Sequence, residues 1–383
     1  GNEVSFSTTA FLPEVTTASP ADITATTAVT GGTVTGDGGA AVIQRGVCYD
    51  TDPLPATSND TILSGTGTGS FISTLNGLIP NTTYYVRAFA TNITGTAYGN
   101  EISFTTPAEL PTLTTETVSG ITGTTAISGG NITYEGGAPV TQRGICWSSN
   151  PTPTLADLFT SDGSGQGAYV SNLSGLIPNH TYYLRAYATN SAGTAFGNEV
   201  SFATALYIPG NGVVDIQNNS YTTLVLGNQE WMGENLKVTL YNNGEPIQQI
   251  FTGAEWSALS TGGWCWMNDN DQYENPYGKL YNSYATTDSR NLCPAGWHVP
   301  THDEWTVLIE YLGGQYAAGG KLKSTRTDPD PHPRWDSPNA GATNEANWAG
   351  LPGGFREHDG DFHELGATGT WWIPMLVILA MWR

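Results

Sequence analysis

The run Gly-Asn-Glu-Val-Ser-Phe at residues 1–6 returns unchanged at residues 197–202, and with Ile in place of Val at residues 99–104. Its starting positions, 1, 99 and 197, are 98 residues apart in both cases. A fixed period of this kind indicates units of one structure placed in tandem. We therefore expect two complete repeats, at 10–106 and 107–204, preceded at 1–9 by the last strand of a further repeat.

Other runs match at the same period within the two complete repeats. Gln-Arg-Gly-Val-Cys at 44–48 returns as Gln-Arg-Gly-Ile-Cys at 142–146, and Gly-Leu-Ile-Pro-Asn at 77–81 returns at 175–179. Each of the latter runs leads into a Thr-Tyr-Tyr segment in which side chains alternate with a period of two, which predicts a half-buried strand. Units of about 100 residues with short strands and turns rich in Gly, Thr and Asn predict β-sandwiches.

A leucine, a proline two residues later and a tyrosine six residues later precede this strand in both repeats. The pattern resembles the tyrosine corner of fibronectin type III domains, with Tyr84 and Tyr182 as the corner residues. The resemblance implies tandem fibronectin III/Ig-like sandwiches. For the lone strand at 1–9 we expect addition to the sheet of another molecule, with Val4 and Phe6 pointing into the acceptor groove.

Charge narrows the classes of partner. The formal net charge is −21, although only 12% of residues are charged. Residues 1–204 contain no lysine, and their arginines form two pairs related by the 98-residue period, which assigns them to the scaffold. An acidic chain without a basic stripe repels phosphate backbones and anionic membranes, so nucleic acid is excluded as a partner.

Composition changes after residue 204. Eleven of the twelve tryptophans and all four lysines lie from Trp231 onward. The run Tyr-Ile-Pro-Gly-Asn-Gly marks a linker at 205–212 and a final domain at 213–383. Capping boxes beginning at Thr252 and Thr301 each precede a helical pattern, and strands are expected at 222–226 and 236–241. The final domain is therefore expected to be α+β in a mostly β chain.

Several ordered motifs of this domain resemble the Fibrobacter succinogenes major paralogous domain. They are Glu-Trp-Met-Gly-Glu-Asn-Leu at 230–236, Trp-Cys-Trp at 264–266, Gly-Lys-Leu-Tyr-Asn at 278–282, Leu-Cys-Pro-Ala-Gly-Trp-His-Val-Pro at 292–300, Leu-Pro-Gly-Gly-Phe-Arg at 351–356 and Trp-Trp at 371–372. The resemblance implies a C-type-lectin-like fold and an extracellular or cell-surface location in bacteria of the Bacteroidota and Fibrobacter type. After Trp372 the chain departs from the family pattern with an apolar run, which is too short to span a bilayer.

Candidate chemical groups are few. Cys48 and Cys146 are expected to be buried thiols, whereas Cys265 and Cys293 are candidates for a disulfide. A loop with Asp269, Asp271 and Glu274 carries the hard oxygen donors that Ca²⁺ requires, although it fails the EF-hand pattern, and a solvated polar loop is the alternative.

The sequence carries no zinc-protease, nucleophile-elbow, P-loop or dinucleotide-binding pattern. His298 and His302 lack the glutamate of a zinc-protease motif, and a glycine-centred acidic turn explains the His-Asp-Gly-Asp-Phe-His run at 358–363. We therefore expect no enzymatic activity and no cofactor other than the candidate calcium.

Two functions remain. The favoured one is a structural subunit that self-associates into an extracellular filament or fibre through the N-terminal strand. The alternative is a cell-surface adhesin in which the sandwiches are a stalk and the tryptophan-rich terminal domain binds a glycan or a protein. An exposed cluster of the later tryptophans is the sign expected for the adhesin.

Overall fold

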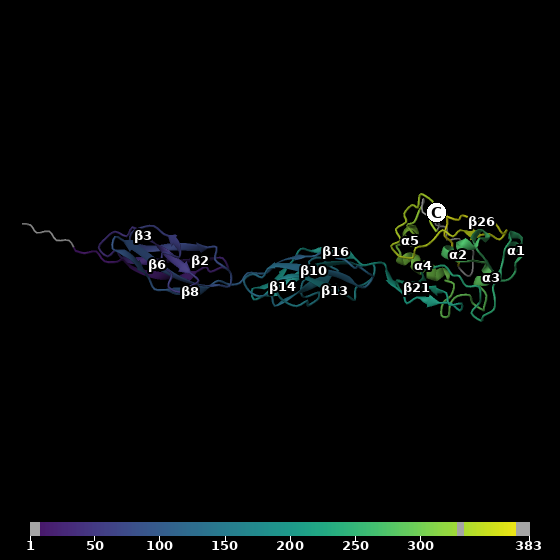
Figure 1. The fold of residues 1–383 in the computed structure, drawn as a ribbon, viewed down its shortest axis with the longest axis horizontal. Coiled ribbons are helices and arrows are strands. Elements are labelled where there is room, and N and C mark those ends of the chain that lie inside the picture. The colour runs from purple at the N-terminus through teal and green to yellow at the C-terminus, as the bar shows by residue number, and fades with distance from the viewer. Residues whose placement is uncertain (1–7, 328–332, 373–383) are drawn as a thin grey trace, which may run out of the picture. The chain divides into compact units, whose positions relative to one another are not determined.

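The computed structural model describes residues 8–327 and 333–372, and it is mostly β. Contacts divide the chain into two compact units, one of residues 1–119, 127–173 and 182–202, the other of residues 120–126, 174–181 and 203–383. Figure 1 shows the labelled helices only in the green and yellow part of the chain, whereas the purple to teal part is built of strands and loops. The predicted assembly strand with Val4 and Phe6 lies outside the described residues, as does the apolar run after Trp372.

The first repeat forms two antiparallel sheets that enclose one core. One sheet has the order β1-β2-β5 and the other β4-β3-β6-β7, with β8 also paired to β6. Buried residues from both sheets, including Ala28, Val47, Leu75 and Val86, make up the core. The strands are β1 (Glu14–Ala21), β2 (Thr27–Gly36), β3 (Gln44–Asp50), β4 (Asp60–Leu63), β5 (Gly69–Asn76), β6 (Thr83–Asn92), β7 (Gly95–Tyr98) and β8 (Ile102–Thr105).

The second repeat has the corresponding strands in the corresponding order. Its sheets are β9-β10-β13 and β12-β11-β14-β15, with β16 also paired to β14. The strands are β9 (Thr112–Thr115), β10 (Ala126–Tyr134), β11 (Gln142–Ser148), β12 (Leu158–Phe159), β13 (Gly167–Leu173), β14 (Thr181–Asn190), β15 (Gly193–Phe196) and β16 (Val200–Ala203). The predicted period-two strand of each repeat is confirmed by β6 and β14, which share one burial pattern.

The recurring Gly-Asn-Glu run makes hydrogen bonds within its own sandwich in both repeats. In the first repeat Asn100 Oδ1 accepts a hydrogen bond from the Thr17 N–H at 3.1 Å, and the Glu101 carboxylate accepts one from the Leu54 N–H. In the second repeat Asn198 and Glu199 make the equivalent bonds to the backbone of Thr115 and Thr152. The run is repeated because each sandwich needs the same internal ties.

Other repeated residues also serve the scaffold. Arg87 donates to the Gly99 carbonyl at 3.2 Å and lies 4.6 Å from the Tyr98 ring centroid, and Arg185 lies 4.7 Å from the ring of Phe196. The Tyr84 hydroxyl accepts a hydrogen bond from the Ile79 N–H at 2.9 Å, which is the type of bond that a tyrosine corner makes.

The described residues of the terminal domain form four small sheets. They are β17-β20-β21, β18-β19, the mixed sheet β22-β23-β24 and the hairpin β25-β26. Residues 207–209, which we expected in a linker, form β17 because their edge pairs with the apolar strand β20. The strands are β17 (Tyr207–Pro209), β18 (Val213–Val214), β19 (Ser220–Tyr221), β20 (Thr223–Leu226), β21 (Gln229–Met232), β22 (Gln248–Gln249), β23 (Gly263–Cys265), β24 (Leu280–Tyr281), β25 (Phe355–Arg356) and β26 (Phe362–His363).

Both predicted helices are confirmed. Thr252 and Thr301 each close a capping box at the start of α1 and α4. Trp305 and Leu308 of α4, with Leu312 directly after it, are buried against β20 and β21. The strand predicted at 222–226 is β20, whereas residues 236–241 are irregular except for a bridge at Leu240. The helices are α1 (Gly253–Ala258), α2 (Glu274–Tyr277), α3 (Ser283–Thr286), α4 (His302–Tyr311) and α5 (Gln315–Leu322), with 3₁₀ turns η1 (Met267–Asp269) and η2 (Asp271–Tyr273).

All four cysteines are free and buried. This confirms the prediction for Cys48 and Cys146 and corrects the predicted disulfide. Cys265 packs with Ile250 in one hydrophobic cluster, whereas Cys293 packs in another. Burial raises the pKa of each thiol to about 11.

Candidate functional site

A cavity of about 1120 Å³ lies in the terminal domain. Its walls are formed by parts of the segments 228–236, 277–286, 292–300, 351–358 and 370–372, together with residues of α1 and α4. Five of the six motifs that carry the family resemblance therefore meet around one space. Convergence of distant segments on a concave space is the usual form of a binding site.

One wall of the cavity is a cluster of tryptophans. Trp231, Trp305 and Trp348 have ring centroids 5.0 to 5.8 Å apart, and Trp371 lies 6.3 Å from two of them. The first three are at most 8% exposed, so they belong to the core as much as to the wall. Their rings fix the shape of the cavity and leave little surface for a ligand.

The aromatic surface available to a ligand comes from other residues. Trp297, Trp371 and Trp372 line the cavity and are half-buried, and Tyr284 on the same lining is 50% exposed. In the described part of the chain no tryptophan reaches the exposed class. The exposed tryptophan cluster expected for an adhesin is thus absent there, and half-buried rings around a cavity stand in its place.

Two buried basic residues of the lining are already neutralised. Arg356 pairs with Asp269 at 3.1 Å, donates to the Gly360 carbonyl at 2.9 Å and lies 4.3 Å from the Phe362 ring centroid. Lys279 pairs with Glu274 and lies 4.8 Å from the ring of Trp264. Among the described lining residues there is consequently no unpaired Lys or Arg to attract an anionic ligand.

The same ion pairs involve two residues of the predicted calcium loop. Asp269 and Glu274 each face a cation, Trp266 Nε1 donates to Glu274 at 3.1 Å, and Asp271 opens a separate 3₁₀ turn. Among the described residues the three carboxylates do not form a group of donors that can hold one ion. Internal pairing thus engages two of the three proposed ligands, and calcium binding at this loop stays a prediction.

Hydrogen-bonding groups complete the lining. His298 Nε2 lies 2.9 Å from Glu304 Oε1, and Glu304 also accepts from the Thr301 N–H at 2.7 Å as part of the α4 capping box. Burial raises the pKa of Glu304, but the hydrogen bonds from Thr301 and His298 outweigh burial and leave that pKa below its ordinary value. His298 is a loop residue and His302 begins α4, as predicted.

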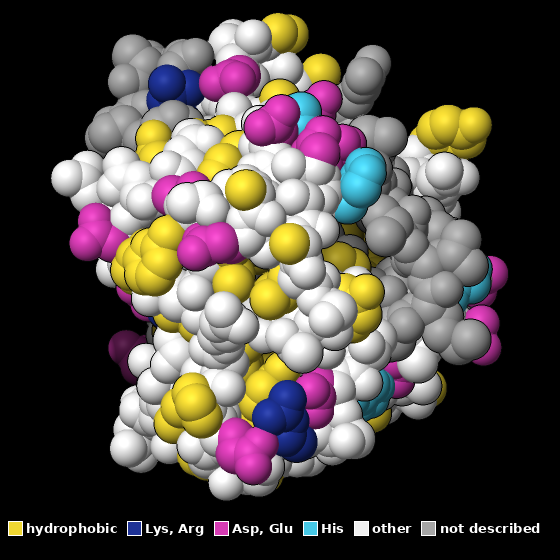
Figure 2. Space-filling view, turned by 90° about the vertical axis from the view of Figure 1, so that its right-hand side faces the viewer, with side chains coloured by type: hydrophobic (Ala, Val, Ile, Leu, Met, Phe, Trp, Pro, Cys, Tyr) yellow, Lys and Arg dark blue, Asp and Glu magenta, His cyan; other side chains and the backbone are white. Residues whose placement is uncertain are grey.

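The face of the molecule in Figure 2 carries scattered acidic side chains, histidines beside some of them, and few basic groups. Glu230, Glu234, Asn235 and Asn282 add further oxygen and amide groups to the cavity lining. The cavity lining therefore combines aromatic faces, amide groups and carboxylates. That combination suits a neutral, hydroxyl-rich ligand better than an anion.

Sequence comparison places the cavity within a known domain. Residues 225–375 match the family described as Fibrobacter succinogenes major domain. The match confirms the resemblance of the terminal domain and contains nearly all of the cavity lining, and it covers less than half of the chain. No curated protein matches the chain.

Proposed function

We propose that the chain is a non-enzymatic adhesin of a bacterial cell surface, whose terminal domain binds a glycan in the cavity. The observation that carries the proposal is the set of half-buried rings, Trp297, Trp371 and Trp372, beside hydrogen-bonding side chains and without an unpaired cation in the described lining. An aromatic face stacks on the apolar C–H face of a sugar ring, while amides and carboxylates bind its hydroxyls.

The family match supports a bacterial surface protein, and an extracellular location is the proposal that follows from it. Within the described residues no helix is long and apolar enough to cross a membrane. We further propose that the sandwiches are fibronectin III/Ig-like repeats and that the terminal domain is C-type-lectin-like. The Tyr84 hydrogen bond supports the first assignment, and the internal use of the repeated residues suits spacer domains.

Glycan binding is tested with the full chain on a glycan array, followed by titration of the best sugar under tryptophan fluorescence. We expect Trp297→Ala to weaken binding about two- to tenfold, since one aromatic stacking contact contributes roughly 0.5 to 1.5 kcal/mol. Tyr316→Ala is the matched control because Tyr316 is fully exposed and lies outside the cavity lining. Equal affinity of both variants would refute the cavity as the site, and binding of proteins alone would support the protein-ligand alternative.

The filament remains a second hypothesis, and it is suggested by the copy of the Gly-Asn-Glu run at residues 1–6, which lies outside the two complete repeats. It requires self-association through residues 1–9, with Val4 and Phe6 in the groove of another molecule. Negative-stain electron microscopy of the full chain and of a variant lacking residues 1–9 separates the two functions. Filaments that disappear with the deletion support assembly, whereas monomers in both samples leave the adhesin.

A further inference from the structure

The hairpin β25-β26 brings three metal-binding side chains together. Phe355 pairs with His363 and Arg356 with Phe362, and the turn between them is closed by a hydrogen bond from the Glu357 N–H to the Asp361 carbonyl at 2.9 Å. Gly360 has φ 94° and a Cβ there would lie 2.3 Å from Gly253, so this turn needs glycine and is held against α1. The side chains on the turn are therefore presented from a fixed backbone.

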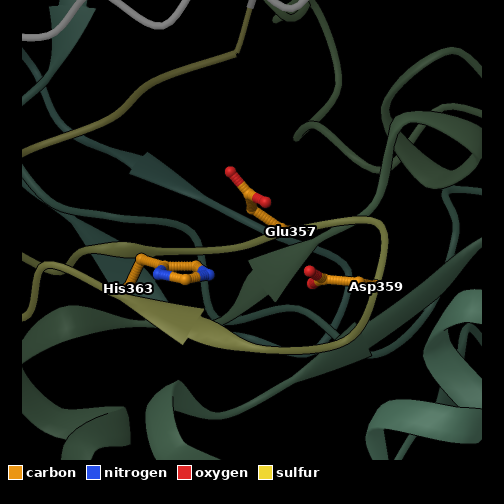
Figure 3. A group of neighbouring side chains, drawn as sticks. All are labelled: Glu357, Asp359 and His363. Carbon is orange, nitrogen blue, oxygen red and sulfur yellow. The ribbon is translucent and has the colours of Figure 1, made fainter.

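Glu357, Asp359 and His363 each offer one ligand atom, and these atoms all lie within 4.8 Å of one another. Figure 3 shows the Asp359 carboxylate and the His363 ring directed toward each other across the hairpin, with Glu357 beside them. No Lys or Arg in the described part of the chain forms an ion pair with the Glu357 or Asp359 carboxylate. The adjacent Arg356 is paired with Asp269 instead. Two carboxylates thus lie close together without a compensating cation.

His363 supplies a second and independent observation. Its Nε2 atom is buried and has no hydrogen-bond partner among the described residues, while its ring stacks on Phe355 at 5.4 Å. A buried nitrogen without a partner is costly, and most such atoms in proteins are paired. A metal ion held between His363 and the carboxylates would give this nitrogen a partner and would neutralise the two negative charges.

We propose that Glu357, Asp359 and His363 form a binding site for a divalent transition-metal ion of the zinc type. Zinc accepts imidazole nitrogen and carboxylate oxygen together at about 2.0 to 2.2 Å, whereas calcium takes oxygen ligands alone. Three protein ligands leave one position of a tetrahedral ion open. Glu357 also lines the cavity, so the ion lies at the rim of the cavity, and the proposal does not depend on glycan binding.

The test is a titration of the untagged full chain with Zn²⁺ alone, by isothermal calorimetry or by competition with a chromophoric chelator. We expect one ion per chain at this site and at least tenfold weaker binding in His363→Gln, Glu357→Gln and Asp359→Asn. Asp361→Asn is the matched control, since it removes the same charge from the same turn without removing a proposed ligand. His302→Gln is the control for loss of an exposed histidine.

Unchanged Zn²⁺ affinity in His363→Gln would overturn the proposal. An equal loss of Zn²⁺ affinity in Asp359→Asn and Asp361→Asn would also overturn it, because only the net charge of the turn would then matter. Binding of Ca²⁺ without Zn²⁺ would overturn it as well. Because His363 packs on Phe355, its variant is checked for folding by tryptophan fluorescence. Glu357→Gln changes an exposed side chain and keeps the test decisive if the histidine variant unfolds.

Discussion

Replacing Asp215 by Asn tests a buried carboxylate of the terminal domain that accepts four hydrogen bonds. Asp215 is 6% exposed. Its Oδ1 accepts from the N–H groups of Gln217 and Asn219 at 2.8 and 3.0 Å, and its Oδ2 accepts from Asn219 Nδ2 at 2.8 Å and the Tyr221 hydroxyl at 2.7 Å. In Asp215→Asn the amide oxygen keeps the first two bonds, while the new NH₂ group faces two donors.

The expected loss of unfolding free energy is about 3 kcal/mol, because two hydrogen bonds to a charged group contribute about 1.5 kcal/mol each. For a domain of about 170 residues this lowers the melting temperature by roughly 6 to 12 °C. Tryptophan fluorescence of the full chain is the assay, since eleven of the twelve tryptophans lie in the terminal domain. Asp361→Asn, an exposed carboxylate in the same domain, is the control and is expected to change stability little.

The same variant predicts a pH dependence. Burial raises the pKa of Asp215, but hydrogen bonds from Asn219, Tyr221 and Gln217 outweigh burial and leave the pKa below its ordinary value. A depressed folded-state pKa stabilises the fold above the unfolded value of about 3.9, and this contribution is lost as the pH falls through the folded value. The difference between wild type and Asp215→Asn should therefore shrink below about pH 4. A loss under about 0.5 kcal/mol at pH 7, or a difference that stays constant down to pH 3, would refute the reasoning.

Three further predictions concern the cores. All four cysteines should resist a thiol reagent at pH 8 in the native chain, because they are buried and burial raises each thiol pKa to about 11. After denaturation without reductant all four should react, because all four are free. Only two reactive thiols would reveal a disulfide. Tyr84→Phe leaves the Ile79 N–H without its acceptor and should lower the unfolding free energy by about 1 kcal/mol. The measurement is amide hydrogen exchange, which should become faster in residues 77–84. Unchanged exchange would argue against the tyrosine corner. Gly32→Ala places a Cβ 2.5 Å from that of Ala88 and should unfold the first sandwich by circular dichroism, whereas Gly36→Ala, with no atom nearer than 3.6 Å, should be tolerated.

The sequence predicted the elements whose signals are local. The capping boxes at Thr252 and Thr301 lie within one turn of the helices they start, and the alternation in 83–92 lies within one strand. Helix α5 was missed because its residues include Gly319 and Gly320, which normally weaken a helix. The glycines are needed here, since a Cβ on Gly320 would lie 2.1 Å from the Gly341 carbonyl oxygen.

The candidate sites depended on distant contacts that no local pattern reveals. Arg356 lies 87 residues from Asp269, and no local pattern predicts that it pairs with a carboxylate of the predicted calcium loop. The cavity could not be predicted either, because its lining comes from segments that are far apart in the sequence, although the family motifs in those segments were recognised. The His363 group was visible as a run of chemistry-bearing residues, but its geometry depends on the register of the β25-β26 hairpin.

The ties made by Asn100 and Glu101 have a consequence for how such chains change in length. Both residues bond within their own repeat, to Thr17 and Leu54, and the second repeat contains the same bonds within itself. A duplication or deletion of 98 residues in frame therefore transfers a set of ties that is already complete, wherever in the period it begins. The number of sandwich repeats in such a chain can thus change in whole steps, because each added repeat already contains the core and the hydrogen bonds that it needs.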